Sequence, residues 1–380
     1  MCIPCLCPYE PWRRLFREVG LRLLPRNDGD DAGEQPSREI YFLATLEFML
    51  LATGILIAGI LLLIKGADWL VEGSSSLAKR FGVSDLMIGL TVVAFGTSMP
   101  ELLVNIVSSI EGANDIAIGN IVGSNIANIL LILGVASVIR NIAVKTSTVW
   151  NEIPLAFLAV VVLQLMANDR IVDHYPASEL SRSDGLAFLA FFLIFLWYVS
   201  KMWRTEDEAE DDGVAKKGAF VSLGLVAAGL SLLILGGKLT VDGAIDIASL
   251  LGISQALIGL TIVAIGTSLP ELVTSVFAAM RNKADIAVGN IVGSNIFNVF
   301  WIMGVSATIH PIQLQPALNV DLFVAILATV VLFIAVHTGH VPRRIFLFWR
   351  QRQAHVIERA DGVIMLLLYA AYIGYLVWRG

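Results

Sequence analysis

Long apolar stretches recur along the chain and are separated by short polar connections. An α-helix needs about 20 apolar residues to cross the hydrocarbon core of a bilayer. The pattern therefore predicts an all-α polytopic membrane protein with about ten transmembrane helices, five in each half. The predicted spans lie near 47–66 (extending towards Lys79), 86–110, 115–139, 148–167, 186–203, 218–250, 256–280, 285–309, 319–337 and 361–379.

The amino-acid composition agrees with a protein most of whose residues lie within the membrane. Of its 380 residues, 57% are hydrophobic and 15% are charged, and the mean hydropathy is +0.77. A soluble domain of this size does not need so much apolar surface. Lysines and arginines lie in short loops, so nothing indicates a groove for nucleic acid. The expected partner is the lipid bilayer, and the sequence indicates neither a cofactor nor an obligate protein partner.

One pair of sequence blocks occurs twice. Residues 89–102 are GLTVVAFGTSMPEL and residues 259–272 are GLTIVAIGTSLPEL. A second block follows each at the same distance, DIAIGNIVGSNIAN from Asp115 and DIAVGNIVGSNIFN from Asp285. The copies align without a gap at an offset of 170 residues, and about 23 of 40 positions are identical. Such self-similarity indicates an internal repeat.

The repeat divides the chain into four segments. They are an N-terminal tail at 1–46, a first membrane repeat at 47–203 (signature region about 86–139), an acidic linker at 204–217, and a second membrane repeat at 218–380 (signature region about 256–309). The tail contains Cys2, Cys5 and Cys7. Both a surface amphipathic helix and a disordered segment fit its sequence.

An odd number of spans per repeat inverts the second repeat in the membrane. The distribution of lysine and arginine supports this topology, because the loops between spans on one side carry only Arg170 and Arg182. By the positive-inside rule that side is external, although the arginines of the tail oppose the assignment. We expect a multi-pass protein of the plasma (inner) membrane.

The motif G-T-S-x-P-E lies in the middle of a predicted span in each copy. Pro100 and Pro270 cannot donate the usual helical hydrogen bond, and Gly96 and Gly266 loosen the same turn. A broken helix leaves backbone carbonyls that membranes tolerate only beside protein or a polar cavity. We therefore predict broken helices at a central site.

Glu101 and Glu271 occupy equivalent positions within these apolar stretches. An ionisable side chain at membrane depth indicates function, and two in equivalent positions predict one ion site shared by two halves. The same motif offers hydroxyl oxygens, and hard cations such as calcium and sodium prefer oxygen ligands. The hydroxyl residues are Thr97, Ser98, Thr267 and Ser268. The alternative is a proline kink with each glutamate hydrogen-bonded for structural reasons.

The second block places three polar residues on one helix face in each copy. They are Asn120, Ser124 and Asn128 in the first copy and Asn290, Ser294 and Asn298 in the second. We expect Ser124, Asn128, Ser294 and Asn298 to line an ion path, whereas Asn120 and Asn290 fit either the path or helix packing. N-capping is the simplest interpretation of Asp115 and Asp285.

The paired GTSxPE and GNxxGSNxxN blocks resemble the two alpha-repeats of the sodium/calcium exchanger family, within the cation/calcium antiporter superfamily. The resemblance is to compact prokaryotic members and covers residues 47–380. It implies ten helices in inverted repeats and a central site where calcium and sodium compete. The ligands that it implies are Thr97, Ser98, Glu101, Ser124, Asn128, Thr267, Ser268, Glu271, Ser294 and Asn298.

One position departs from part of that family. Some relatives, including potassium-dependent exchangers, have aspartate where this chain has Asn298. The site therefore has two carboxylates rather than three, which argues against potassium dependence and leaves the stoichiometry open.

The expected function is secondary active exchange of calcium for sodium by alternating access. A calcium/proton exchanger is an alternative, since burial of a carboxyl group favours its neutral form. A passive cation channel would use the same polar path without two gates. We do not expect an enzyme, because the predicted spans contain no cysteine and no histidine near the repeated blocks.

Overall fold

A computed structural model describes residues 38–172, 174, 177–202, 217–251, 264–338 and 355–379. The chain divides into two units, Met1–Glu47 and Phe48–Gly380. Of the first unit, the described part is the helical segment that begins at Arg38. The predicted tail before that residue with its cysteines, the linker before Lys217 and the start of the span expected at 256–280 lie outside the described residues.

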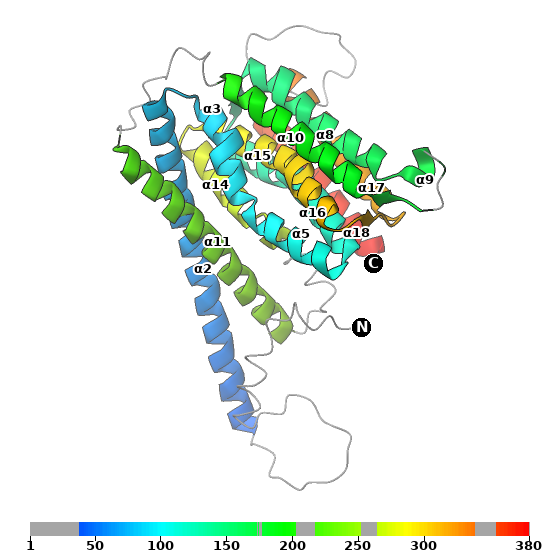
Figure 1. Ribbon diagram of the computed structural model, residues 1–380. Coiled ribbons are helices and arrows are strands. Elements are labelled where there is room, and N and C mark those ends of the chain that lie inside the picture. The colour runs from blue at the N-terminus through cyan, green and yellow to red at the C-terminus, as the bar shows by residue number, and fades with distance from the viewer. Residues whose placement is uncertain are drawn as a thin grey trace. The chain divides into compact units, whose positions relative to one another are not determined.

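From Arg38 onward, the described residues of the first half are mostly helical (Figure 1). Its elements are α2 (Arg38–Phe81), α3 (Asp85–Ile88), the π-helix η1 (Gly89–Val93), α4 (Ala94–Thr97), α5 (Met99–Glu111), α6 (Asn114–Ile126), the π-helix η2 (Ala127–Leu133), α7 (Gly134–Ile139), β1 (Ile142–Val144), the π-helix η3 (Thr148–Glu152), α8 (Ile153–Met166), α9 (Asp169–Val172), β2 (Glu179–Leu180) and α10 (Arg182–Met202).

The second half repeats much of this order. Its elements are α11 (Ala219–Leu250), α13 (Ala264–Gly266), α14 (Leu269–Met280), α15 (Ala284–Ile296), the π-helix η5 (Phe297–Met303), α16 (Gly304–Ile309), β3 (Ile312–Gln313), α17 (Leu318–Thr338), β4 (His355–Ile357) and α18 (Arg359–Arg379). The π-helices η2 and η5 occupy equivalent positions in the two repeats. Such segments within α-helices often occur at functional sites.

Two short strand pairs, which the sequence analysis did not predict, connect the halves. Strand β1 pairs with β4 in an antiparallel register that places Ile142 opposite Ile357. Strand β2 pairs with β3 and places Leu180 opposite Ile312. All four of these side chains are buried. Each pair therefore ties a connection of one repeat to a connection of the other.

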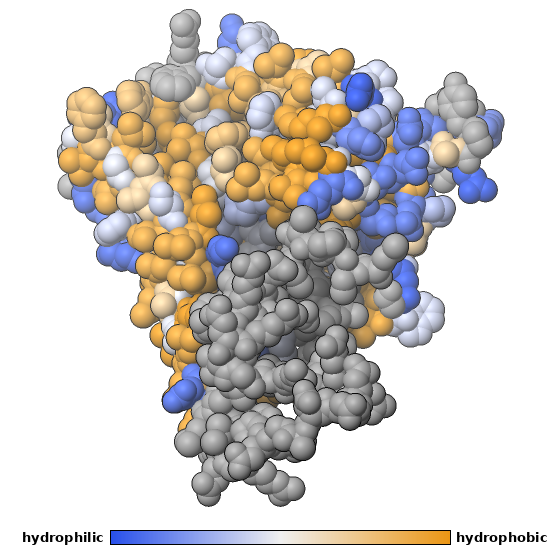
Figure 2. Space-filling view, turned by 60° about the horizontal axis from the view of Figure 1, so that its bottom comes forward, coloured by the Kyte–Doolittle hydropathy of each residue, from blue (hydrophilic) through white to orange (hydrophobic). Residues whose placement is uncertain are grey.

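The described ranges contain eight helices that are long and apolar enough to cross a membrane, or up to nine if a bent pair counts as one span. The number ten stays a prediction, because the span expected at 256–280 is described only from Ala264. Many large apolar side chains are exposed, among them Leu61 and Phe220, and hydrophobic side chains cover much of the face in Figure 2. A surface of this kind suits lipid rather than water, so the protein is a predominantly helical, multi-pass membrane protein.

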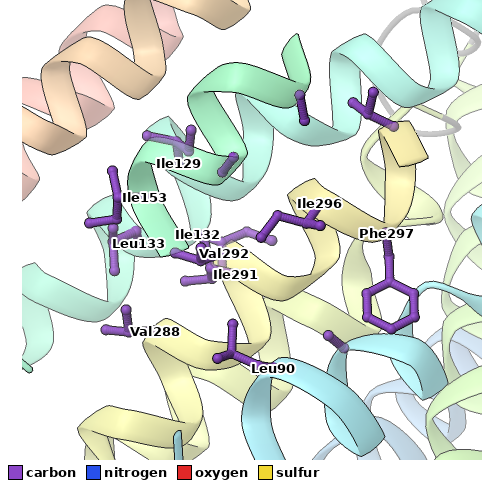
Figure 3. Close-up of a cluster of buried hydrophobic side chains, with 14 of the residues drawn as sticks. Leu90, Ile129, Ile132, Leu133, Ile153, Val288, Ile291, Val292, Ile296 and Phe297 are labelled. Atoms are coloured by element: carbon purple, nitrogen blue, oxygen red, sulfur yellow. The ribbon is translucent and has the colours of Figure 1, made fainter. Parts of the chain in front are cut away.

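The best-buried spans are Asn114–Ile139 and Ala284–Ile309, which contain the second signature block of each repeat. Figure 3 shows apolar side chains from both halves packed in this centre, among them Ile132 beside Ile291. The polar residues of these blocks are therefore held inside the molecule by an apolar core shared between the repeats.

Helices α2 and α11 pack along glycines and run in opposite directions (Figure 1). A Cβ atom at Gly66 would lie 2.8 Å from the carbonyl oxygen of Gly229, and one at Gly59 would lie 2.8 Å from that of Gly236. Small residues permit such close backbone contact in membranes. Gly59 and Gly66 are the repeat equivalents of Gly229 and Gly236, so equivalent helices cross antiparallel, as an inverted repeat requires.

Candidate functional site

The helix of each first block is interrupted beside its serine. Helix α4 ends at Thr97 and α5 begins at Met99, with a bend of 46° between the helices on either side. In the second copy, α13 ends at Gly266 and α14 begins at Leu269. Pro100 and Pro270 lie in the first turn of the following helix, where a missing N–H removes no helical hydrogen bond.

Gly96 and Gly266 have a packing role at these breaks. A Cβ atom at Gly96 would collide with Leu230, and one at Gly266 would collide with Val241. Both partners belong to α11. The glycines therefore let α11 approach the turn just before each break.

The breaks bring both glutamates into the interior. Glu101 lies in the first turn of α5 and Glu271 in the first turn of α14, and each is 1% exposed. Within the part of the chain that the structure describes, no ion pair joins either carboxylate to a lysine, arginine or histidine. A buried negative charge without such a partner is costly.

Each carboxylate accepts a hydrogen bond from a serine of the other repeat. The Oγ of Ser98 donates to Oε1 of Glu271 at 3.0 Å, and the Oγ of Ser268 donates to Oε1 of Glu101 at 3.3 Å. Ser124 also donates to Oε1 of Glu101, at 3.5 Å. The two halves therefore build one polar centre rather than two separate ones.

The remaining serine contacts extend this centre. The hydroxyl of Ser98 lies 3.0 Å from that of Ser294, and the hydroxyl of Ser268 lies 3.2 Å from that of Ser124. All four serines are buried. The four serines thus connect the broken helices to the second blocks in a repeated pattern.

Asn120 and Asn290 take part in a hydrogen-bond network around the breaks. The Oγ1 of Thr97 donates to Oδ1 of Asn290 at 3.0 Å, and that of Thr267 donates to Oδ1 of Asn120 at 3.5 Å. The amide nitrogen of Asn120 donates to Oδ1 of Asn105 at 2.7 Å. Oxygen and nitrogen of the Asn120 amide are therefore both engaged within the protein.

The amide nitrogen of Asn290 is engaged in the same way. It donates to Oγ of Ser275 at 3.0 Å. Ser275 is the repeat equivalent of Asn105, the residue that accepts from Asn120. These contacts favour a positioning role for Asn120 and Asn290 over direct contact with an ion.

Within the two copies of the repeated blocks, four buried side-chain oxygens accept no hydrogen bond from the described residues. They are Oε2 of Glu101, Oε2 of Glu271, Oδ1 of Asn128 and Oδ1 of Asn298. Native proteins satisfy most buried polar atoms, so four such acceptors at repeat-equivalent positions need an explanation. Two carboxylate and two amide oxygens are the ligand types that calcium and sodium take.

The structure also shows polar residues that the sequence analysis missed. Asn125 and Asn295 are almost fully buried and contact Asn298 and Asn128. The repeated GSN sequence could have indicated them, because both asparagines recur at the offset of 170 residues. Asn105 could not be identified from the repeat, because the equivalent position of the second repeat holds Ser275 rather than asparagine.

The predicted N-caps are wrong. Ala113 and Lys283 are the N-cap residues of α6 and α15, and neither makes a side-chain capping bond. Asp115 instead accepts from Nε2 of Gln315 at 2.7 Å, and Asp285 lies 3.2 Å from Nζ of Lys145. Each aspartate therefore contacts the other repeat, a long-range pairing that local capping rules do not contain.

Comparison with known proteins adds independent evidence. The family model described as "Sodium/calcium exchanger protein" matches residues 51–201 and 221–378. The sodium/calcium exchanger MaX1 of Methanosarcina acetivorans is 32% identical, over 84% of this chain and 96% of that protein. The inner membrane protein YrbG of Escherichia coli is 38% identical, over 74% of this chain and 88% of that protein. A solved structure of the sodium-calcium exchanger NCX_Mj has a TM-score of 0.72 and 33% identity, over 86% of this chain and 99% of that one.

Proposed function

Because the chain belongs to the sodium/calcium exchanger protein family, we propose that it exchanges calcium for sodium across a membrane as a secondary active antiporter. The family is one of transporters rather than enzymes. The name of the Escherichia coli relative supports a place in the inner, or plasma, membrane. Alternating access would expose one central site to each side in turn.

The pair of buried carboxylates, each with one oxygen that accepts no hydrogen bond from the described residues, supports this function most directly. Oε2 of Glu101 and Oε2 of Glu271 accept no hydrogen bond within the described residues, and no basic side chain there pairs with them. Two carboxylates balance the charge of one calcium ion, so a bound calcium would offset the cost of burying both. The amide oxygens of Asn128 and Asn298 would complete its ligands together with serine hydroxyls.

Sodium would use the same oxygens. The carboxylates supply charge, while the hydroxyls of Ser98 and Ser268 and the backbone carbonyls freed at the helix breaks supply neutral ligands. Thr97 and Thr267, which contact Asn290 and Asn120, would hold the broken segments that carry these ligands. If calcium and sodium need the same carboxylates, they cannot be bound together, and that exclusion couples the two fluxes.

Uptake of radiolabelled calcium into proteoliposomes tests the proposal. Vesicles loaded with sodium and diluted into sodium-free medium should accumulate calcium, while vesicles loaded with potassium should not. Uptake driven by a proton gradient with sodium absent from both sides would establish a calcium/proton exchanger instead. Calcium entry that follows its own gradient without any counter-ion would indicate a channel.

A further inference from the structure

Asn125 and Asn295 meet each other where the two second blocks approach. They are repeat equivalents on α6 and α15, and each is 2% exposed. The amide nitrogen of Asn125 donates to the backbone oxygen of Asn295 at 3.3 Å, and that of Asn295 donates to the backbone oxygen of Asn125 at 3.4 Å. These reciprocal bonds fix which end of each amide faces its partner's backbone.

With the nitrogen end committed, the oxygen end of each amide faces another asparagine. Oδ1 of Asn125 accepts from Nδ2 of Asn298 at 2.9 Å, and Oδ1 of Asn295 accepts from Nδ2 of Asn128 at 2.9 Å. An asparagine amide can be turned end for end at little steric cost, so such contacts decide its orientation. The amides of Asn128 and Asn298 are thereby held with their oxygens away from these donors.

Those held oxygens are two of the four buried oxygens in the repeated blocks that accept no hydrogen bond from the described residues. We propose that Asn125 and Asn295 are positioning residues, each of which aims the amide oxygen of the other repeat's asparagine at the transported cation. The inference deepens the proposed function and rests on its cation site. Without the acceptor on residue 125, the Asn298 amide could present its NH₂ group to the ion, and that dipole would repel a cation.

The pairing is specific and crosses between the repeats. Asn125 lies three residues before Asn128 in the same repeat, yet its oxygen holds Asn298 of the other repeat. Asn128 is held by Asn295. Loss of the Asn125 side chain should therefore disturb the ligand oxygen of Asn298 and leave that of Asn128 in place.

Double-mutant cycles on calcium binding test the positioning role. Radiolabelled calcium binding is measured at equilibrium on the purified full-length protein in detergent, after size-exclusion chromatography has shown that each variant is folded. Asn125→Ala should weaken calcium binding by roughly 10-fold, as for other residues that orient a metal ligand. The same substitution should cause almost no further loss of calcium affinity when Asn298 is already alanine, because the amide that Asn125 positions is then absent.

The matched control combines Asn125→Ala with Asn128→Ala. In this double variant, the two fold-losses of calcium affinity should multiply. A purely structural role at the repeat interface would give the same additional loss in both combinations, and that result would overturn the inference. If the first set of variants does not fold, the equivalent cycle starts from Asn295→Ala. Its effect on calcium binding should vanish when Asn128 is alanine and persist when Asn298 is alanine.

The outcome also separates this inference from the proposed function. A wild-type protein that binds calcium but shows no sodium-driven uptake would contradict sodium exchange alone, while the binding cycles would still decide the positioning role. A folded wild-type protein that binds neither calcium nor sodium would overturn the proposed function and the positioning role together.

Discussion

At the scale of single residues, the buried glutamates dominate the energetics of the centre. Serine hydroxyls donate to one oxygen of each carboxylate, and such bonds recover only part of the hydration lost on burial. The other oxygen of each has no donor within the described residues. A bound cation would supply the missing charge and ligation at once, which would explain why two acidic groups are tolerated in the buried centre.

Glu101→Gln and Glu271→Gln should each reduce calcium transport by at least about 100-fold. Each substitution removes a buried charge, and this loss should weaken the binding free energy of calcium by about 3 kcal/mol or more. The protein should remain folded and extractable, since glutamine retains the shape and an acceptor for serine. Calcium flux in proteoliposomes measures the effect.

Glu111→Gln serves as the control, because Glu111 is exposed at the end of α5. This variant should transport calcium at the wild-type rate. Near wild-type flux in either of the two buried variants would rule out a site with two carboxylates.

Asn298→Asp should retain cation binding but change ion preference or coupling. The substitution puts a carboxylate where an amide oxygen lacks a donor, and it also replaces the NH₂ group that donates to Asn125. The new acceptor would face Oδ1 of Asn125, so a cation or a proton is needed between them. A more tightly held ion can also slow the exchange cycle.

Calcium flux against sodium concentration and pH, compared with Asn128→Asp, measures this change. The two variants need not match, because the two repeats are predicted to have opposite orientations in the membrane. If the flux profiles of both variants coincide with that of the wild type, Asn128 and Asn298 do not line the ion path and serve helix packing instead.

At the scale of elements, α2 and α11 depend on glycines at their contact. Gly66→Ala would place a Cβ atom 2.8 Å from the backbone oxygen of Gly229, which cannot move without shifting the helix. We expect a loss of stability of about 1–3 kcal/mol, as for other overpacked sites, visible as a lower Tm in detergent.

Gly54→Ala is the matched control, since nothing lies within 4 Å of that Cβ position in the same helix. Its alanine should leave the Tm unchanged or raise it slightly through helix propensity. Equal effects of the two substitutions would show that the glycines do not mediate close packing.

The helix breaks were predictable from local sequence, whereas the contacts between the repeats were not. A proline one turn after a glycine in an apolar span predicts a break, and the structure interrupts the helix beside Ser98 and Ser268. Contacts between the repeats were not predictable, because a fixed offset identifies equivalent residues without saying what each one touches. The bonds from Asn125 to Asn298 and from Gln315 to Asp115, like the strand pairs, depend on how the two halves dock.

At the scale of the whole molecule, the repeat is symmetric in sequence but not in every contact. Asp68 of α2 pairs with Arg281 beyond the end of α14. The equivalent positions hold Lys238 and Glu111, with the charges exchanged, and no ion pair joins these two within the described part of the chain. Unequal contacts in two inverted halves are what a site open to one side at a time needs.

The inverted arrangement predicts which connections face the same side. After replacement of Cys2, Cys5 and Cys7, single cysteines at Ala209 in the linker and at Ala177 in the loop before α10 should react with an impermeant thiol reagent from opposite faces of the membrane. The reason is the distribution of lysine and arginine among the loops, together with an odd number of spans per repeat. Labelling of both positions from one face would contradict the inverted topology.

If one set of buried oxygens serves calcium and sodium in turn, the two ions must compete for the protein. Equilibrium binding of radiolabelled calcium to the purified protein, measured over a range of sodium concentrations, tests it most directly. Sodium should displace all of the bound calcium competitively, so that the apparent calcium affinity falls steadily as the sodium concentration rises. Potassium at the same ionic strength should have little effect. Calcium binding that persists at saturating sodium, or sodium bound together with calcium at this site, would show that the two ions do not share these oxygens.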